Sequence, residues 1–463
     1  MEFQNYDLAF LTAFIIFVIV FLSTRKHNLS RQGILFLYRT QFGIKFIDKF
    51  AEKYKKILRP LQYVVILSGF CLMFGGIYFF IQSTYLYLKL PIASVIRAPP
   101  IAPLIPYFPK IFGLESFFPP LYFTYFLIAL AIVGITHEFS HGIFARLHKL
   151  KIKSTGFAFL GPILGAFVEP DEKQLEKTKK LPHMSILAAG TFANLLMTIL
   201  FGAIIILFFK FSFMPAGVNF NSYAVTPIDL GEAKIIWNSS YEKFAKLEFN
   251  GKNYFVDSSS LENSIKNKLP LIYAYDDSPA FKSNLKGPIM EIDGEKIQSK
   301  EDLQRILLAH KPNDKIRIKT AVTNPGTEVV NEIKTYDIEL GEREGKAFLG
   351  VGFIDGQSRG FIGKVYTLTL AKVKKPGIFY SSSIGEFGWF IYYLLWWIVV
   401  INFLVALFNM LPLGILDGGK FFYLTVLGIT KKEKIASRAY SFATWFMLAL
   451  LVILMLKWAF SFF

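Results

Sequence analysis

The sequence predicts a polytopic α-helical membrane protein of about six transmembrane helices, with a strand-rich domain inserted on the extracytoplasmic side. The first observation is composition: of the 463 residues, 53% are hydrophobic and only 18% are charged, a balance that suits lipid as the solvent for much of the chain. The second is a contrast within the chain. Residues 215–370 are rich in charged side chains, Asn and Ser, and their alternating segments KIRIKTAV and KTYDIEL are typical of strands.

Six apolar runs are long enough to cross about 30 Å of hydrocarbon. Lys and Arg cluster between the first two runs, after the third and before the sixth. Because positive residues favour cytoplasmic connections, we expect these three connections in the cytoplasm, and both termini and the 215–370 domain outside. The acidic start, MEFQNYD, argues against a removable signal peptide. The runs are residues 7–23, 61–84, 121–146, 185–209, 386–411 and 437–461.

These runs and their connections divide the chain into six parts. The parts on either side of the 215–370 domain carry the polar motifs described below. Many prolines interrupt residues 91–120, which predicts an extended or re-entrant outer loop because a helix would lack too many N–H donors there. Besides the 215–370 domain, the parts are 1–60, with the first span and a basic cytoplasmic connector; 61–120, with the second span and the Pro-rich loop; 121–210; 385–430; and 437–463, with the last span.

The net charge of +17 does not predict a nucleic-acid partner. The Lys and Arg residues lie beside apolar segments, as at the cytoplasmic flanks of membrane helices, and no nucleic-acid-binding motif occurs in the sequence. The expected surroundings are therefore a lipid bilayer. The single cysteine, Cys71, excludes an intrachain disulfide. No feature of the sequence specifies an oligomeric state.

A metal-binding pattern ends the third apolar run, in GITHEFSHGIFARLHK. His137 and His141 are four residues apart, so on a helix they stack one turn above the other and can direct two imidazole nitrogens at one ion. Glu138 follows the first histidine, where its carboxylate can reach a water on the metal rather than the metal itself. Two histidines and a glutamate in an apolar helix are costly to bury without partners, and a metal ion removes that cost.

A hydrolytic zinc site needs three protein ligands and one open position. The best third ligand is Asp417 in FNMLPLGILDGGKFF, a carboxylate in an otherwise apolar stretch just past the fifth run. Pro412 and the glycines around Asp417 are expected to break the helix, so that backbone at membrane depth lines a cavity. The alternative for Asp417 taken alone, a cap of the next helix, is the weaker one, and it weakens further once the histidine pair is considered.

With both motifs identified, the chain resembles the site-2 protease family of intramembrane metalloproteases, in its PDZ-containing prokaryotic branch. HEFSH and NMLPLGILDGG occur in the family's order, and the resemblance covers residues 121 to 428. It implies Zn²⁺ held by His137, His141 and Asp417, with Glu138 as the general base. The implied activity is an intramembrane zinc endopeptidase that cuts transmembrane segments of substrate proteins near the cytoplasmic face, as in regulated intramembrane proteolysis.

Two asparagines also match the family's pattern. Asn409 stands eight residues before Asp417 and is expected to orient the substrate or stabilise the oxyanion. Asn194 lies in AAGTFANLL, which looks like the family's small-residue motif, and is expected to line the substrate path. Thr191 stands where many relatives carry proline. An interhelical hydrogen bond in a small-residue interface explains Asn194 equally well.

Two further segments resemble parts of the family. STGFAFLGPILGAFVEPDE, with Gly156, Gly161 and Gly165, resembles its membrane-dipping β-hairpin, which could pair with an unwound substrate by β-augmentation. An ordinary cytoplasmic loop is the alternative for this segment. SPAFKSNLKGPIMEIDGEKIQSKEDLQRIL looks like a PDZ core: a turn and short helix, a strand, then a helix beginning near Ser299. Residues 215–270 are then either an elaborated strand region or a second, degenerate copy.

Two other functions fit parts of the pattern. A prenyl-protein processing enzyme also places HExxH near a membrane face, but takes a glutamate as its third ligand and has no need of a PDZ-like domain. A non-proteolytic membrane transporter or PDZ-type adaptor would need the outer domain but not the full set of metal ligands.

Overall fold

The structure is a computed structural model that describes residues 3–25, 29–33, 35–89, 104–115, 117–160, 163–237, 241, 243–324, 326–353 and 370–460. Two compact units divide the chain: Met1–Ile205 with Ile391–Phe463, and Ile206–Phe390. About half of the Pro-rich 91–120 segment and Gly161 of the expected hairpin lie outside the described residues.

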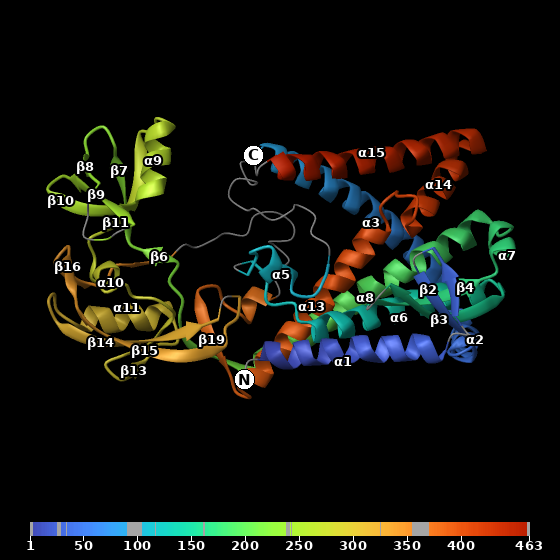
Figure 1. Cartoon of the computed structure of the whole chain (residues 1–463), viewed down its shortest axis with the longest axis horizontal. Coiled ribbons are helices and arrows are strands. Elements are labelled where there is room, and N and C mark those ends of the chain that lie inside the picture. Colours follow the sequence, from blue (N-terminus) through green and yellow to red (C-terminus); the bar gives the residue numbers. More distant parts are fainter. Residues whose placement is uncertain are drawn as a thin grey trace. The chain divides into compact units, whose positions relative to one another are not determined.

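Among the described residues, six helices are long and apolar enough to cross a membrane, as the sequence predicts (Figure 1). They are α1 (Phe3–Thr24), α3 (Lys55–Lys89), α6 (Phe123–Leu147), α8 (Lys180–Ser212), α13 (Glu386–Asn409) and α15 (Glu433–Phe460). The shorter helices are α2 (Ile44–Lys53), α5 (Phe108–Ile111), α7 (Glu172–Glu176) and α14 (Asp417–Thr430). α3 extends beyond the apolar run 61–84 at both ends, from Lys55 to Lys89.

A core of buried apolar side chains joins the helices of the first unit. It includes Val65 and Met73 on α3, Ala145 on α6, and Ala188 on α8. Phe421 on α14 is fully buried in the same core and lies in edge contact with Phe70 on α3. The core therefore holds α14 against the helices that carry the polar motifs.

Charged side chains from one helix cap the end of another. Asp7 on α1 accepts hydrogen bonds from the backbone N–H groups of Phe123 and Thr124, at 2.7 and 2.9 Å, at the start of α6. The hydroxyl of Tyr107 also donates to Asp7. On α15, Lys457 donates to the last carbonyls of α3. Each charge complements the partial charge of the helix end that it caps, so α1 is fixed to the helix with the histidines.

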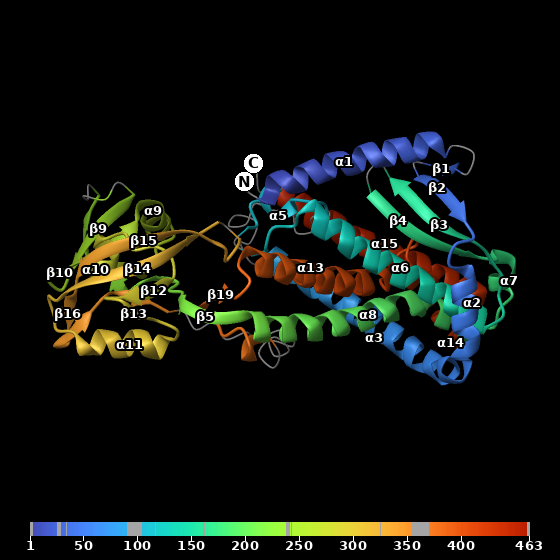
Figure 2. The ribbon, with the colours of Figure 1, turned by 90° about the horizontal axis from the view of Figure 1, so that it is seen from below.

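A four-stranded antiparallel sheet completes the first unit, in the order β1-β2-β3-β4 (Figure 2). The hairpin of β3 and β4 matches the expected STGFAFLGPILGAFVEPDE hairpin. The hairpin of β1 and β2 was not predicted, because the sequence indicated only a basic connector there. The strands are β1 (Leu29–Gln32), β2 (Leu35–Thr40), β3 (Ile152–Leu160) and β4 (Ile163–Pro170).

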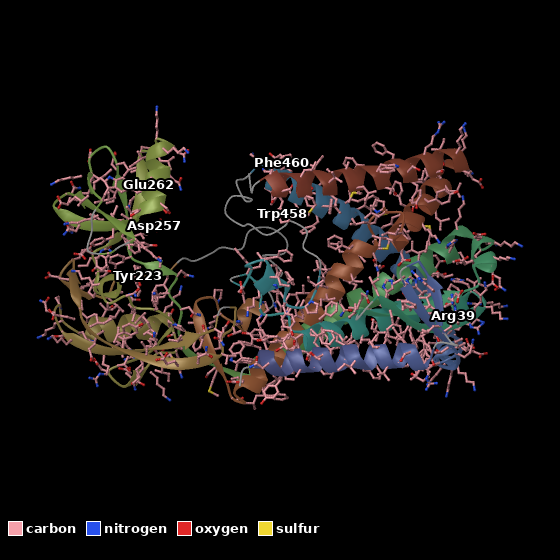
Figure 3. The ribbon with its side chains drawn as sticks, in the orientation of Figure 1. Arg39, Tyr223, Asp257, Glu262, Trp458 and Phe460 are labelled. Atoms are coloured by element: carbon pink, nitrogen blue, oxygen red, sulfur yellow. The ribbon has the colours of Figure 1, made fainter. Side chains whose placement is uncertain are left out.

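Polar contacts tie three strands of this sheet together. Glu169 on β4 accepts hydrogen bonds from the Ser154 hydroxyl on β3, at 2.6 Å, and from Arg39 on β2, at 3.2 Å. Arg39 is labelled in Figure 3. The Ser154 hydrogen bond, followed by Arg39, holds the pKa of Glu169 below its ordinary value. Glu169 therefore stays ionised and pairs with Arg39 across the sheet.

The edge strand β4 packs along α6. A Cβ atom added to Gly134 would lie 3.5 Å from the backbone nitrogen of Ala166. One added to Gly142 would lie 3.2 Å from Cγ1 of Val168. Ile47 on α2 is fully buried in the cluster that contains Val168. The sheet is thus held directly against the helix with the histidines.

The second unit is rich in strands, as predicted. Its first sheet has the order β15-β14-β12-β5-β19, with β13 paired to β12, and its second has the order β7-β11-β10-β9-β8. The elements of the first sheet are β5 (Phe213–Val218), β12 (Ile289–Ile292), β13 (Glu295–Lys296), β14 (Lys315–Thr323), β15 (Val330–Glu339) and β19 (Ile378–Ser382). Those of the second are β7 (Val225–Asp229), β8 (Lys234–Ile236), β9 (Phe244–Phe249), β10 (Lys252–Asp257) and β11 (Leu271–Asp276).

Short elements complete this unit. They are β6 (Ser222–Tyr223), β16 (Gly341–Arg343), β17 (Lys346–Phe348), β18 (Val351–Gly352), α9 (Ser258–Lys266), α10 (Pro279–Lys282), α11 (Lys300–Ala309) and a 3₁₀ turn at Leu370–Lys372. The expected short helix, strand and second helix are α10, β12 and α11. The second helix begins near Ser299, as expected, and the Ser299 side chain caps it. Phe281 on α10 lies 5.4 Å, ring to ring, from Tyr223 and 4.9 Å from Phe255. Figure 3 shows Tyr223 where the two sheets meet.

Candidate metal centre

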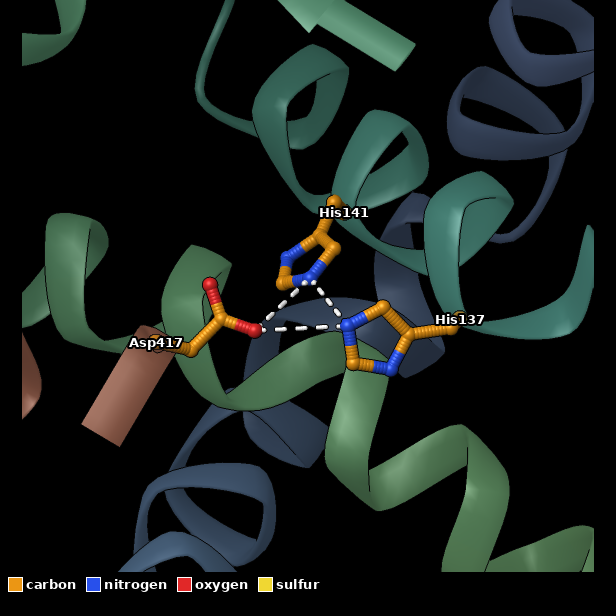
Figure 4. Close-up of side chains that lie close together, drawn as sticks. All are labelled: His137, His141 and Asp417. Atoms are coloured by element: carbon orange, nitrogen blue, oxygen red, sulfur yellow. Dashed lines mark hydrogen bonds and ion pairs between the residues drawn. The ribbon is translucent and has the colours of Figure 1, made fainter. Parts of the chain in front are cut away.

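Three predicted ligands, far apart in the sequence, meet in the first unit (Figure 4). Nε2 of His137 lies 3.0 Å from Nε2 of His141. Oδ2 of Asp417 lies 3.3 Å from each of these nitrogens. His137 is 7% exposed, and the side chains of His141 and Asp417 are 13% and 24% exposed. Among the described residues, these three form the cluster that could hold a metal ion.

Local structure explains how the three side chains converge. The two histidines are one turn apart on α6, so both rings project from the same face. α13 ends at Asn409 and α14 begins at Asp417, with the predicted helix break between them. A Cβ on Gly418 would lie 2.2 Å from the backbone carbon of Met410, so only glycine allows this tight turn. Lys180 on α8 donates to the carbonyl of Leu427 at 2.8 Å, near the far end of α14.

The outer ring nitrogens of both histidines have partners on α8. Nδ1 of His141 lies 2.7 Å from the backbone carbonyl oxygen of Ile186. Because a carbonyl can only accept, this nitrogen carries a proton and donates it. Nδ1 of His137 lies 3.1 Å from the side-chain amide of Asn194, which is fully buried. Histidines that ligate metals commonly have such partners on the other ring nitrogen.

Gly190 lies on α8 between these two partners. A Cβ there would lie 2.5 Å from Nε2 of His141 and 2.6 Å from Cε1 of His137. Such distances are too short for real atoms, so the two rings need a glycine at this position. From the sequence, the AAGTFANLL motif that contains Gly190 was expected either to line the substrate path or to form a small-residue interface. The contact of Gly190 with the histidines was not predicted.

The three side chains fit a zinc ion. Ligands at about 2.0–2.1 Å from a tetrahedral zinc are about 3.3 Å apart, close to the 3.0 and 3.3 Å distances between the three ligand atoms. With its proton on Nδ1, His141 presents a lone pair at Nε2 toward a carboxylate and a second ring. Electron pairs directed at one another need a cation between them.

Glu138 lies on the side of α6 that faces the sheet. Its Oε2 accepts a hydrogen bond from the backbone N–H of Val168 on β4, at 3.0 Å. The side chain is half-buried. The β4 edge therefore holds the orientation of this carboxylate, a contact that no sequence pattern indicated.

The two asparagines are placed differently. Asn194 contacts His137 directly, so the structure brings it to the metal centre. Asn409 is the last residue of α13 and is half-buried. It lies at the start of the turn that leads to Asp417. Among the described residues, no hydrogen bond or ion pair joins Asn409 to the three ligands.

Comparison with known proteins identifies relatives of the whole membrane core. The sequence pattern of peptidase family M50 matches residues 125–454, more than half of the chain. The chain is also 27% identical over 418 residues to an uncharacterised protein of Methanocaldococcus jannaschii, covering 88% of this chain and 82% of that protein. The M50 match contains both the histidine pair and Asp417.

Proposed function

Since the chain belongs to peptidase family M50, the metallopeptidase family of the site-2 proteases, we propose that it is a zinc endopeptidase that cuts peptide bonds within the membrane. Six apolar helices and the family indicate a multi-pass membrane protein. The observation that carries the proposal is the convergence of His137, His141 and Asp417. Family M50 is generally zinc-dependent, and these side chains would hold the ion.

Zinc would supply a Lewis acid that polarises a carbonyl and acidifies water. Glu138 acts as the general base: its carboxylate accepts a proton from the attacking water and passes it to the leaving amine. The hydrogen bond from Val168 fixes one carboxylate oxygen, so the other can face the water. Hydrolysis by this route needs no covalent intermediate with the protein.

Asn409 is proposed to stabilise the oxyanion or to orient the substrate peptide. Its place at the end of α13, beside the turn to Asp417, supports this role. Replacing one donor to an oxyanion typically lowers kcat about 10²–10³-fold. Asn409→Leu should therefore slow cleavage by about that factor while bound zinc stays unchanged.

The proposed substrates are transmembrane segments of other proteins, cut during regulated intramembrane proteolysis. A helical substrate hides its carbonyls in hydrogen bonds, so it must unwind before hydrolysis. β4 is the edge strand of its sheet and could pair with the unwound segment. Because Val168 already donates to Glu138, and the backbone nitrogen of Ala166 lies against α6 beside Gly134, pairing would use the residues of β4 between Ala166 and the hairpin tip.

The orientation of the chain is also a proposal. The Lys and Arg clusters favour a cytoplasmic location for the sheet and for the start of α8. The strand-rich second unit would then be extracytoplasmic. Its α10, β12, α11 and β14 follow the order of a PDZ-like domain, which would select substrates by size or bind their trimmed ends.

The competing functions account for less of the molecule. A transporter or an adaptor has no need of two histidines and an aspartate within 3.3 Å of one another. A prenyl-protein processing enzyme would use a glutamate where this chain places Asp417. Peptide-bond hydrolysis by the three-ligand site is the function that these contacts support best.

Cleavage of model transmembrane segments tests the proposal. We expect purified, zinc-loaded protein in lipid to cut segments that contain Gly or Pro, and to cut the same segments more slowly when Leu replaces these residues. Mass spectrometry of the products gives the cut sites. Equal rates for both sets would contradict the unwinding step, and no cleavage of any segment would contradict the proposed activity.

A further inference from the structure

One face of α8 lines the histidine pair. Ile186, Gly190 and Asn194 are spaced at i, i+4 and i+8, so they lie on a single stripe of the helix. Ile186 contacts His141, and Asn194 contacts His137. Gly190 leaves the room that both rings occupy. α8 thus supplies a partner for each ring on the side opposite the metal-binding nitrogens.

For His141, the protonation of the ring follows directly from this contact. The Ile186 carbonyl accepts from Nδ1 at 2.7 Å, so the neutral ring has its lone pair on Nε2. For His137, the side-chain amide of Asn194 offers either an acceptor oxygen or a donor nitrogen. The amide nitrogen of Asn194 is placed 3.1 Å from Nδ1 of His137, and a half-turn of the amide exchanges that nitrogen with the oxygen.

The hydroxyl of Thr136 decides between the two orientations of the amide. Its oxygen lies 2.7 Å from the Ile132 carbonyl oxygen, and 3.3 Å from both the Val133 carbonyl oxygen and the end of the Asn194 amide that faces away from His137. Its single proton goes to the nearest of these acceptors, the Ile132 carbonyl. Since that proton is already used, the hydroxyl can only accept from Asn194. The nitrogen of Asn194 then faces Thr136, and its oxygen faces His137.

We propose that Asn194 is a positioning residue: its side-chain oxygen accepts the Nδ1 proton of His137 and holds the ring in the tautomer whose Nε2 binds the metal. This inference depends on the proposed zinc site and goes beyond it, because it assigns Asn194 to the metal centre rather than to the substrate path. Each contact from His137 through Asn194 and Thr136 to Ile132 then has one donor and one acceptor.

The expected effect is on metal affinity. Loss of a partner to the outer nitrogen of a ligand histidine typically weakens metal binding about 10–100-fold. Without the acceptor, the buried Nδ1–H is unsatisfied, and the ring favours other tautomers and orientations. Asn194→Leu should therefore weaken zinc binding by about that factor, while Asn194→Asp, which keeps an acceptor oxygen, should bind zinc at least as tightly as wild type.

The experiment measures the affinity of detergent-purified protein for Zn²⁺ by competition with a chromogenic chelator, and the visible spectrum of the Co²⁺-substituted protein. Thr191→Val is the matched control. Thr191 is also fully buried on α8, but its hydroxyl donates within the helix, to the Ala188 carbonyl. We expect Thr191→Val to match wild type. Asn194→Ala provides a second loss variant if Asn194→Leu does not fold.

The outcomes separate this inference from the proposed function. If wild type binds no zinc, the metal site itself is wrong. If wild type binds zinc and the Leu and Ala variants bind it equally well, the positioning role is wrong and the metal site stands. A weakened Asn194→Asp would also contradict the inference, because it would mean that Asn194 donates to His137. A raised KM with unchanged zinc affinity would assign Asn194 to the substrate path instead.

Discussion

Glu138→Gln should abolish most peptide-bond cleavage while leaving the bound metal in place. Glutamine has the size of glutamate, and its amide oxygen can still accept the hydrogen bond from Val168. What it lacks is a basic carboxylate that takes a proton from water. General-base catalysis typically contributes about 10²–10⁴-fold, so we expect the single-turnover rate on a model transmembrane segment to fall by at least that range.

Two comparisons make this prediction specific. The zinc content of Glu138→Gln should equal that of wild type, because Glu138 is not among the three side chains that converge. Glu176→Gln, an exposed change at the end of α7, should leave the rate unaltered. A Glu138→Gln protein that cleaves within a few-fold of wild type would show that another group accepts the proton.

Gly190→Ala should remove metal binding almost completely. The added methyl group would lie 2.5 Å from Nε2 of His141, the nitrogen proposed to face the ion, and 2.7 Å from Nδ1 of His137. Either the rings or α8 must move, and both movements separate the ligands. We expect the affinity for Zn²⁺ to fall by at least about 100-fold, the upper end of what changes outside the ligand set cause, and cleavage to be lost with it.

Gly202→Ala on the same helix is the matched control. It makes the same chemical change, but the structure shows open space around the Cβ position of Gly202. Both variants should be compared for metal affinity, and size-exclusion chromatography should check that each elutes as a folded protein. If Gly190→Ala retains wild-type zinc affinity, α8 does not pack against the histidines as described.

The sequence predicted the parts that depend on local patterns. Long apolar runs fixed the number of membrane helices, since length and hydropathy alone determine whether a helix can span a bilayer. The spacing of His137 and His141 predicted one shared ion because an α-helix places residues four apart on one face. Pro412 and the glycines near Asp417 predicted the break between α13 and α14.

The parts that were missed depend on contacts between distant segments. β2 pairs with β3 through residues more than a hundred positions away, such as Tyr38 with Phe157, and β1 pairs only with β2. Basic residues obscure the alternation of both strands. The hydrogen bond from Val168 to Glu138 depends on how β4 packs along α6. Gly190 carried a signal in its spacing from Asn194, but that signal has meaning only once α8 is known to face the histidines.

The most direct test is the zinc content of the purified protein, measured by mass spectrometry of the metal after loading and dialysis. We expect one zinc ion per chain in wild type, and almost none in Asp417→Ala or in His141→Ala. Zinc retained at full occupancy in Asp417→Ala, or absent from folded wild-type protein, would contradict a metal centre built from His137, His141 and Asp417.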